Sequence, residues 1–340
     1  MNKTQTLLMP AEWLPQAAMW MSWPYNEETW PENLAAAQLE FVEFAKTIAR
    51  FQQVKILCGG PAHAQAKSAL GKVANIELID IPTNDAWARD YAPTFVKDQT
   101  TDELVVINWF YNAWGGKYPP FDDDQQVATR IANHLGLEVV SPNLCFEGGA
   151  IEVNDSGLML CTRSCAFDPN RNPGKSLAEV EQMFADYLGV KQIIWLSGDA
   201  IEGDDTDGHI DQLARFIDDE TIVYAWCHDH ADPQHARLAQ NLSDLKNGLA
   251  GFGLTDFRLI PLPIPDPIEL CGRRVPGSYC NFLIANGVVV VPQFGDTTYD
   301  RIAMEILTPL FPRHEVVALN SVNLSVGLGS FHCLSQQQPE

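Results

Sequence analysis

The feature that most constrains the fold of this 340-residue chain is a recurring order of elements: a β-hairpin, a helix and one further strand. Short apolar runs occur in pairs, and the turn inside each pair is made of residues such as Asp, Asn, Gly and Ser, which favour tight turns. The turn tips fall near residues 99, 155, 219 and 286, at steps of 56 to 67 residues. Such spacing is typical of a propeller or another repeat array.

Four complete copies of the unit can be assigned. The predicted hairpins cover residues 94–109, 150–161, 213–226 and 281–292; the helices cover 122–134, 176–188, 232–246 and 299–310; the closing strands cover 137–140, 192–196, 257–262 and 315–319. One helix start is marked by Ser176 and Glu179, which have the spacing of a capping box.

A fifth unit is predicted to be split between the two ends of the chain. Residues 331–335 would form its first strand, and residues 17–23 the antiparallel partner. A helix at 31–50 and a strand at 54–57 would complete it. This pairing would close a ring, so the element order predicts one α/β domain over residues 1–340, a five-bladed propeller of ββαβ units. An ordinary open α/β sheet is the alternative.

Composition limits the partners of the protein. There are 44 acidic against 22 basic residues, a net charge of -22, which disfavours nucleic acid and anionic membranes and suits a small cation. No apolar run approaches the ~20 residues of a membrane span. The first residues lack the pattern of a signal peptide, so we expect a cytoplasmic protein. The eight cysteines form no Cys-x-x-Cys pair, and we expect them to be reduced and mostly buried.

Polar residues gather at the start of the first strand in four of the units. They include Asp90, Glu147, the pair His209 and Asp211, and Cys333. If the units are equivalent, these side chains converge on the ring axis. The sequence therefore predicts one axial pocket in which a thiol, an imidazole and three carboxylates meet.

These residue types suggest a reaction. Cys333 is the candidate nucleophile, and His209 is a proton shuttle near neutral pH. In a strand, His209 and Asp211 would face the same side. Three carboxylates would oppose the anion formed by a cysteine protease, but they would hold a guanidinium, which is planar and permanently charged. Structural roles stay open for each residue: a buried thiol, a satisfied histidine, a turn at Glu147, or a surface ion pair at Asp90.

Several motifs, in order from about residue 9 to residue 339, together resemble one family. They are Met9-Pro-Ala-Glu-Trp13, Asn84-Asp85-x-Trp87-x-Arg89-Asp90, Asn112-Ala-Trp114-Gly-Gly, Glu147-Gly-Gly, Asn170-Arg-Asn-Pro173, Asp207-Gly-His209-x-Asp211 and His332-Cys333-x-x-Gln336. The chain resembles the agmatine deiminases, which belong with the bacterial peptidyl-arginine deiminases to the guanidine-modifying superfamily. The resemblance implies a five-bladed α/β propeller (pentein) with an axial active site, and neither a metal nor an organic cofactor.

The resemblance also implies roles. Cys333 would be the nucleophile and His209 the acid and base, while Asp90 and Asp211 would clamp the guanidinium and Glu147 would orient His209. Attack of Cys333 would give a covalent amidino-thioether, and water would then release a ureido product. For agmatine that product is N-carbamoylputrescine.

The chain departs from the family pattern at three places: Ala92, a thin glycine loop at 327–331, and Arg163 between Thr162 and Ser164. An arginine at the pocket mouth would suit a carboxylate, so arginine or a peptide ending in arginine is an alternative substrate. A non-catalytic guanidine or polyamine binder and an amidino transferase are further alternatives.

Three tryptophans, Trp20, Trp87 and Trp114, are candidates to line the alkyl chain of the substrate, with plain core packing as the alternative. Loops 112–120 and 199–207 are candidate lids. The sequence leaves open whether the chain forms a homo-oligomer.

Overall fold

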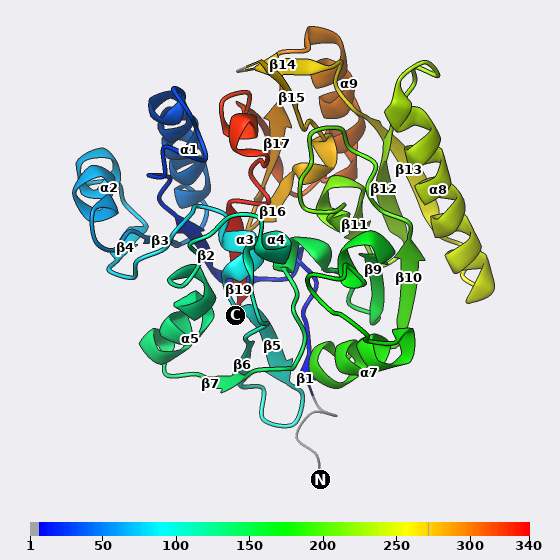
Figure 1. Cartoon of the computed structure of the whole chain (residues 1–340), viewed down its shortest axis with the longest axis horizontal. Coiled ribbons are helices and arrows are strands. Elements are labelled where there is room, and N and C mark those ends of the chain that lie inside the picture. Colours follow the sequence, from blue (N-terminus) through cyan, green and yellow to red (C-terminus); the bar gives the residue numbers. More distant parts are fainter. Residues whose placement is uncertain (1–6, 271) are drawn as a thin grey trace.

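The computed structural model describes residues 7–270 and 272–340, and shows five ββαβ units that follow one another around the molecule (Figure 1). In each unit the first and second strands pair antiparallel, and the second and third pair in parallel. A parallel pair needs a crossover connection, and the unit's helix supplies it. The predicted α/β fold of repeated ββαβ units is confirmed.

Four units are continuous in the chain, and their strands and helices lie close to the predicted ranges. The first has β5 (Thr94–Asp98), β6 (Leu104–Ile107), α5 (Asp124–Leu135) and β7 (Glu138–Val140); the second has β8 (Glu152–Val153), β9 (Leu158–Thr162), α7 (Leu177–Leu188) and β10 (Gln192–Leu196); the third has β11 (Ala214–Asp218), β12 (Thr221–Trp226), α8 (Pro233–Gly251) and β13 (Arg258–Pro263); the fourth has β16 (Leu283–Ala285), β17 (Val288–Gln293), α9 (Thr297–Leu307) and β18 (Glu315–Asn320). The predicted capping box at Ser176 and Glu179 begins α7.

The fifth unit joins the two ends of the described chain, as predicted, but its first strand lies later than expected. β19 (Ser335–Pro339) pairs antiparallel with β2 (Gln16–Ser22), and β2 pairs in parallel with β3 (Val54–Leu57) across α1 (Leu34–Ala49). The prediction of a strand at 331–335 is wrong because residues 331–334 form a turn.

Smaller elements add to these units. β1 (Leu7–Leu8) extends the first sheet next to β5. α2 (Ala62–Leu70) and β4 (Ile76–Ile79) extend the fifth sheet, and β14 (Ile268–Leu270) with β15 (Arg273–Val275) forms a separate hairpin. Within residues 7–270 and 272–340, none of the helices combines the length and apolar character needed to cross a bilayer.

The central strand of each unit is covered on both faces. β17 reads Val-Val-Val-Val-Pro-Gln and β9 reads Leu-Met-Leu-Cys-Thr, and nearly all of these residues are buried. Continuous apolar runs of this kind are typical of strands in parallel arrangements with two covered faces. The seven cysteines that the structure describes are free thiols and are buried; Cys271 lies outside the described residues.

A short helical turn stands before the first strand of every unit, and the sequence did not reveal it. These turns are α3 (Ala88–Tyr91), η2 (Gly148–Ala150), η3 (Ile210–Gln212), η4 (Tyr279–Asn281) and the turn at residues 331–334. Neighbouring turns contact one another, α3 against η2, η2 against η3, and η3 against η4. In Figure 1, α3 and β19 lie near the middle of the ring of units.

A buried ion network holds four units together at this point. Arg215 of β11 is fully buried, and its guanidinium donates to Glu152 (Nε–Oε2 2.8 Å) and Glu12 (Nη2–Oε2 2.8 Å). It also donates to the carbonyl oxygen of Phe282 at 2.6 Å. His332 contacts the same Glu12 oxygen through Nε2 at 2.8 Å. Together these bonds link the segment before β2, the second, third and fourth units, and the C-terminal turn.

We therefore expect Arg215→Met to lower the free energy of unfolding by about 3–5 kcal/mol, because it leaves Glu12 and Glu152 buried without their main cation. Urea unfolding measures this change. The matched control is Arg301→Met, since Arg301 pairs with Glu305 on an exposed helix face with side chains 60% and 61% exposed, where a loss within about 0.5 kcal/mol is expected. Equal effects of the two substitutions would contradict the structural role of the network.

Candidate active site

The turns that precede the first strands bring most of the predicted site residues together. Asp90 lies in α3, His209 and Asp211 lie at the start of and within η3, and Glu147 directly precedes η2. Cys333 lies in the turn before β19, and its carbonyl oxygen accepts a hydrogen bond from the backbone of α3, at Arg89, at 3.1 Å. Residues that are far apart in sequence thus meet because each occupies a similar place in its own unit.

The sulfur of Cys333 lies among polar side chains at the buried end of a cavity. Asn281 donates its side-chain amide to Sγ at 3.1 Å, and the Asp211 Oδ2 atom lies 3.6 Å from Sγ. The amide of Gln212 is a further neighbour at 3.9 Å. Burial, together with the carboxylates of Asp211 and Asp90, raises the pKa of the Cys333 thiol well above its ordinary value. In the free protein the sulfur is therefore a protonated thiol.

His209 lies between two carboxylates. Its Nδ1 is 3.6 Å from Asp90 Oδ1, and its Nε2 is 3.7 Å from Glu147 Oε2. Both ring nitrogens are buried, and neither has a hydrogen-bond partner within normal range. Burial disfavours the charged imidazolium, but Asp90, Cys165 and Glu147 together outweigh this cost, so the pKa of His209 lies well above its ordinary value. The imidazole is therefore ready to donate a proton.

Glu147 is fixed by a residue whose role the sequence did not reveal. Arg171 donates Nε to both carboxylate oxygens of Glu147, at 2.8 and 3.1 Å, and both side chains are completely buried. Burial raises the pKa of Glu147, but the Arg171 guanidinium more than offsets this effect and lowers it to about 2. The signal was available, because Arg171 lies in the Asn170-Arg-Asn-Pro173 motif.

The carboxylates of Asp90 and Asp211 differ in their hydrogen-bond partners. Asp90 accepts the backbone N–H of Gly149 on Oδ1 and the indole N–H of Trp114 on Oδ2, both at 2.9 Å. Burial raises its pKa to about 6. Asp211 Oδ2 contacts His332 Nδ1 at 2.7 Å, and its Oδ1 is buried without a hydrogen-bond partner. Burial raises the pKa of Asp211, but His332 outweighs it, so the net shift is downward.

The prediction that His209 and Asp211 face the same side of a strand is wrong. They do not alternate along a strand, because η3 begins directly after His209 and contains Asp211. His209 therefore points between Asp90 and Glu147, while Asp211 contacts the sulfur of Cys333. His332 is absent from the cavity lining and bridges Asp211 and Glu12.

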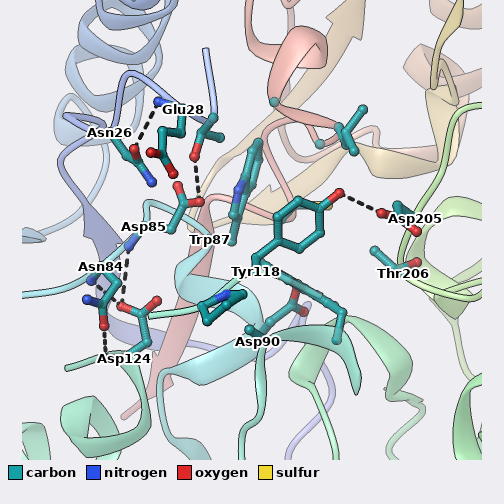
Figure 2. A pocket seen from close by; sticks show the side chains of 18 of the residues that line it. Asn26, Glu28, Asn84, Asp85, Trp87, Asp90, Tyr118, Asp124, Asp205 and Thr206 are labelled. Atoms are coloured by element: carbon teal, nitrogen blue, oxygen red, sulfur yellow. Dashed lines mark hydrogen bonds between the residues drawn. The ribbon is translucent and has the colours of Figure 1, made fainter. Parts of the chain in front are cut away.

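A cavity of about 380 Å³ opens next to Cys333 (Figure 2). Trp87, Trp114 and Asp90 line it, as does Cys333 itself. Its lining also carries acidic residues, namely Glu28, Asp85, Asp124 and Asp205. The cavity thus combines aromatic walls with an acidic surface.

Trp20 and Arg163 do not belong to this cavity. Trp20 is fully buried and packs edge-on against His134 at a ring-centroid distance of 6.3 Å, with its indole N–H bonded to Gln338 at 3.0 Å. It therefore belongs to the core, and the prediction that it lines the substrate is corrected. The guanidinium of Arg163 lies over the ring of Trp195 at 5.6 Å, outside the cavity lining.

The thin glycine loop before Cys333 is required by close packing against tryptophan. A Cβ atom on Gly329 would lie 2.4 Å from the ring of Trp87 and 3.0 Å from the Cβ of Cys333. A Cβ atom on Gly327 would lie 2.7 Å from Trp30. These positions have no space for a larger residue, so the glycines allow the loop to bring the cysteine against the aromatic wall.

The two predicted lid loops are joined across the cavity. The ammonium group of Lys117 donates to Asp205 Oδ1 at 3.0 Å and to Asp207 Oδ1 at 2.8 Å. The hydroxyl of Tyr118 donates to Asp205 Oδ2 at 2.5 Å (Figure 2). The other oxygen of Asp207 accepts from Arg171 at 2.5 Å. A continuous chain of ion pairs therefore runs from the mouth of the cavity to Glu147.

A five-unit α/β fold in which Cys333 and Asp90 line a cavity, with a histidine and two further acids buried beside them, defines the class of the deiminases. The family model of the Porphyromonas-type peptidyl-arginine deiminases matches residues 8–339, and the chain belongs to this family.

Relatives extend over nearly the whole chain. An agmatine deiminase of Pseudomonas syringae pv. tomato is 38% identical over 357 aligned residues, which cover 97% of this chain and 95% of that protein. Among solved structures, the agmatine deiminase of Enterococcus faecalis is 30% identical with a TM-score of 0.91, covering 99% and 97% of the two chains.

Two further solved structures are informative. A cysteine-to-serine variant of the C. jejuni agmatine deiminase with substrate bound is 29% identical with a TM-score of 0.90, covering 98% and 96% of the two chains. A dimethylarginine dimethylaminohydrolase is 10% identical with a TM-score of 0.53, covering 95% and 99%, and this likeness concerns the fold alone.

We expect Lys117→Met to raise KM for the substrate about 3- to 10-fold with little change in kcat, because a partly exposed charged contact contributes about 1 kcal/mol and the Asp207–Arg171–Glu147 bonds remain. Steady-state kinetics separate the two constants. Lys97→Met is the control, because Lys97 also makes a carboxylate contact and its side chain is 31% exposed against 29% for Lys117. An unchanged KM in Lys117→Met would contradict a role of this contact in closing the cavity.

Proposed function

We propose that the protein hydrolyses agmatine to N-carbamoylputrescine and ammonia through a covalent intermediate on Cys333. The observation that carries this proposal is the thiol of Cys333 at the buried end of the cavity, with Asp90 in the same lining. The side chains of Asp211, His209 and Glu147 are buried next to these two. Membership of a deiminase family, and relatives named agmatine deiminases, support the same reaction class.

A bound guanidinium would compensate the negative charge of the site. A guanidinium has N–H donors on all of its edges. It would donate to the unpartnered Oδ1 of Asp211 on one edge and to Asp90 on another, leaving its carbon toward Cys333. The added positive charge would offset the effect of the two carboxylates on the thiol, so that binding itself favours loss of the thiol proton to solvent and formation of the reactive thiolate.

In the first half of the reaction the thiolate attacks the guanidinium carbon and forms a C–S bond. His209, which is protonated in the free protein, gives a proton to the departing nitrogen, and ammonia leaves as the C–N bond breaks. The product of this half is an amidino-thioether on Cys333. Glu147, held by Arg171, keeps the imidazole in place and stabilises its charge.

In the second half, water takes the place of ammonia. His209, now neutral, accepts a proton from the water as its oxygen attacks the amidino carbon. The C–S bond breaks and the sulfur leaves as a thiolate, while the added oxygen loses its second proton to solvent and becomes the carbonyl oxygen of the ureido product, which is then released. Each half moves one proton through His209, so the imidazole returns to its starting state after each turnover.

The cavity beyond the reacting carbon favours an amine tail. Glu28, Asp85 and Asp124 contribute acidic groups to its lining, which suit the ammonium of agmatine and oppose the carboxylate of arginine. The lining also holds the cation Arg273, but its guanidinium donates to the carbonyl oxygen of Val326 at 2.6 Å. Arginine as the substrate would need the Arg163 guanidinium at the mouth of the cavity, but this group packs on the ring of Trp195. Agmatine is therefore preferred over arginine and over peptides that end in arginine.

The test is to incubate the protein with agmatine, arginine and a peptide ending in arginine, and to measure the ureido product. We expect kcat/KM for agmatine to exceed that for arginine at least tenfold, a difference of about 1.4 kcal/mol. Equal values would contradict the choice of agmatine, and no ureido product from any of the three would contradict deimination.

We expect Cys333→Ala to lower activity at least about 10³-fold, because the covalent route is lost. Intact-protein mass spectra of acid-quenched wild-type reactions should show the amidine adduct, and spectra of the variant should not. Cys227→Ala is the matched control, a buried cysteine whose sulfur donates to the Asp229 carbonyl oxygen at 3.5 Å, and it should keep its activity. Full activity of Cys333→Ala would remove the assigned nucleophile.

The pKa of Asp90, raised to about 6 by burial, predicts the acid side of the pH profile. Below this value Asp90 is neutral in the free enzyme and holds a cation poorly, so kcat/KM should fall more steeply as the pH drops below about 6 than it does above this value. Trp114→Phe removes the N–H that stabilises the Asp90 carboxylate, so it should move this limb to higher pH. A profile that stays flat down to about pH 5 would contradict the role of Asp90.

A further inference from the structure

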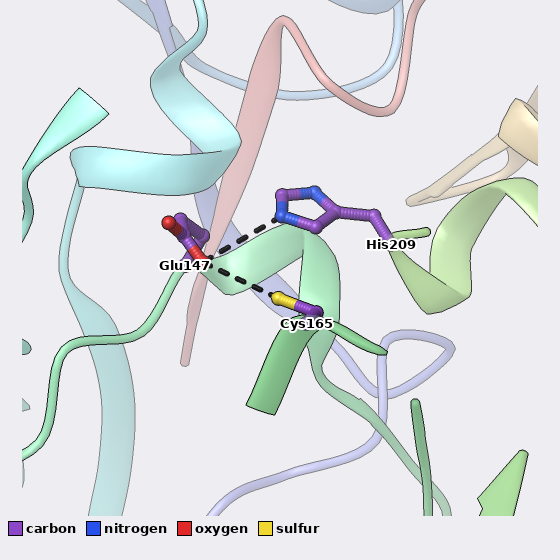
Figure 3. Close-up of side chains that lie close together, drawn as sticks. All are labelled: Glu147, Cys165 and His209. Carbon is purple, nitrogen blue, oxygen red and sulfur yellow. Dashed lines mark hydrogen bonds and ion pairs between the residues drawn. The ribbon is translucent and has the colours of Figure 1, made fainter. Parts of the chain in front are cut away.

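A second thiol lies beside the imidazole, and the proposed reaction does not use it. Cys165 is fully buried in the short helix α6 (Arg163–Ala166), and its sulfur lies 3.6 Å from Glu147 Oε2. His209 Nε2 lies 3.7 Å from the same oxygen. Figure 3 shows the carboxylate, the thiol and the imidazole pointing toward one another.

We propose that Glu147, Cys165 and His209 form a binding site for a thiophilic divalent metal ion such as Zn²⁺, and that the bound ion inhibits the enzyme by occupying His209. The three candidate ligand atoms all lie within 4.8 Å of one another. Zinc bonds of about 2.3 Å to sulfur and about 2.0 Å to nitrogen or oxygen place tetrahedral ligands about 3.3–3.6 Å apart. The side chains are thus near zinc spacing before any ion arrives.

The surroundings of His209 suit a metal ligand. Its Nε2 has no hydrogen-bond partner and faces Glu147 and Cys165, while Nδ1 lies 3.6 Å from Asp90. A ligating histidine usually gives its other N–H to a carboxylate, which fixes the ring. Asp90 is placed for that role, so one orientation of the imidazole meets both requirements.

Charge and donor type favour a thiophilic ion over magnesium or calcium. Binding forms bonds from the metal to sulfur, nitrogen and oxygen, and releases the protons on Cys165 Sγ and His209 Nε2 to solvent. The thiolate and the Glu147 carboxylate then neutralise the two charges of the ion. Arg171 keeps its bond to Glu147 Oε1 and is balanced by Asp207. Thiolate and imidazole ligands select zinc-like metals, whereas magnesium and calcium prefer oxygen.

A second cluster with metal-ligand residues, Glu12, Glu152 and His332, does not offer the same opportunity. Its ligand atoms also lie close together, but Arg215 bonds both carboxylates and is itself fully buried. The position that a metal would need is already taken by this guanidinium. Of these two clusters, the one that contains Cys165 therefore remains open to a metal ion.

The experiment uses Cd²⁺, whose bond to a thiolate gives an ultraviolet charge-transfer absorption, and a Cys333→Ala protein, so that the nucleophile cannot contribute. We expect the absorption to saturate at one Cd²⁺ per chain. Adding Cys165→Ala should abolish it, whereas adding Cys161→Ala, a buried cysteine outside the cluster, should not. Absorption that persists without Cys165, or that is absent in Cys333→Ala, would overturn the proposal.

The imidazole and the inhibition are tested separately. In the Cys333→Ala protein, His209→Gln keeps both the Cys165 thiol and the Glu147 carboxylate and should weaken Cd²⁺ binding at least about tenfold. Unchanged affinity would overturn the site.

The inhibition is tested in protein with Cys333 intact. The Cys165→Ala variant should need at least about tenfold more Zn²⁺ to lose half of its own uninhibited rate. An unchanged requirement would overturn the inhibitory role. The Cd²⁺ measurements need no substrate, so they stand or fall independently of the proposed reaction.

Discussion

The rest of the structure depends on the burial of carboxylates where the five units meet. Glu12, Glu147 and Glu152 are each nearly or fully buried, and an arginine pairs with each of them. A buried charge is tolerated only when it is paired and hydrogen-bonded. The arginines therefore do more than stabilise single contacts. Arg215 joins Glu152 of the second unit to Glu12 before β2. Arg171 joins Glu147 of the second unit to Asp207 before the third, so the bonds of both arginines also hold neighbouring units together.

Asp90 and Asp211 are the exceptions, because neither forms an ion pair with an arginine side chain among the described residues. Asp90 is held by neutral donors and lies near His209, and Asp211 has one oxygen without a partner. The negative charges of these two carboxylates are therefore not neutralised by an arginine, and they raise the pKa of the neighbouring Cys333 thiol. A bound planar cation would neutralise them. The substrate thus supplies the charge that the fold leaves out, which links the binding of the cation to activation of the nucleophile.

Local sequence patterns were sufficient for the hairpins, the crossover helices and the parallel strands, because each depends on neighbouring residues. They also placed Cys333, His209 and three acids near one another through the repeat. The short turns were missed, since three or four residues carry no measurable periodicity. The bond between Arg215 and Glu12 was missed because it joins residues 203 positions apart. Trp20 was misplaced for a related reason: an aromatic residue in an apolar strand does not reveal which face meets the cavity.

The position of Glu147 explains why catalysis and metal binding share one place. To keep His209 charged and oriented, a buried carboxylate must lie next to Nε2, and Arg171 must hold it there. This arrangement leaves Nε2 without a strong hydrogen bond, so that its proton can be transferred. An imidazole nitrogen that no other protein group bonds is also open to a metal ion once its proton has left. With the Cys165 sulfur beside the same carboxylate, the features that suit His209 for moving protons also make it accessible to a thiophilic ion.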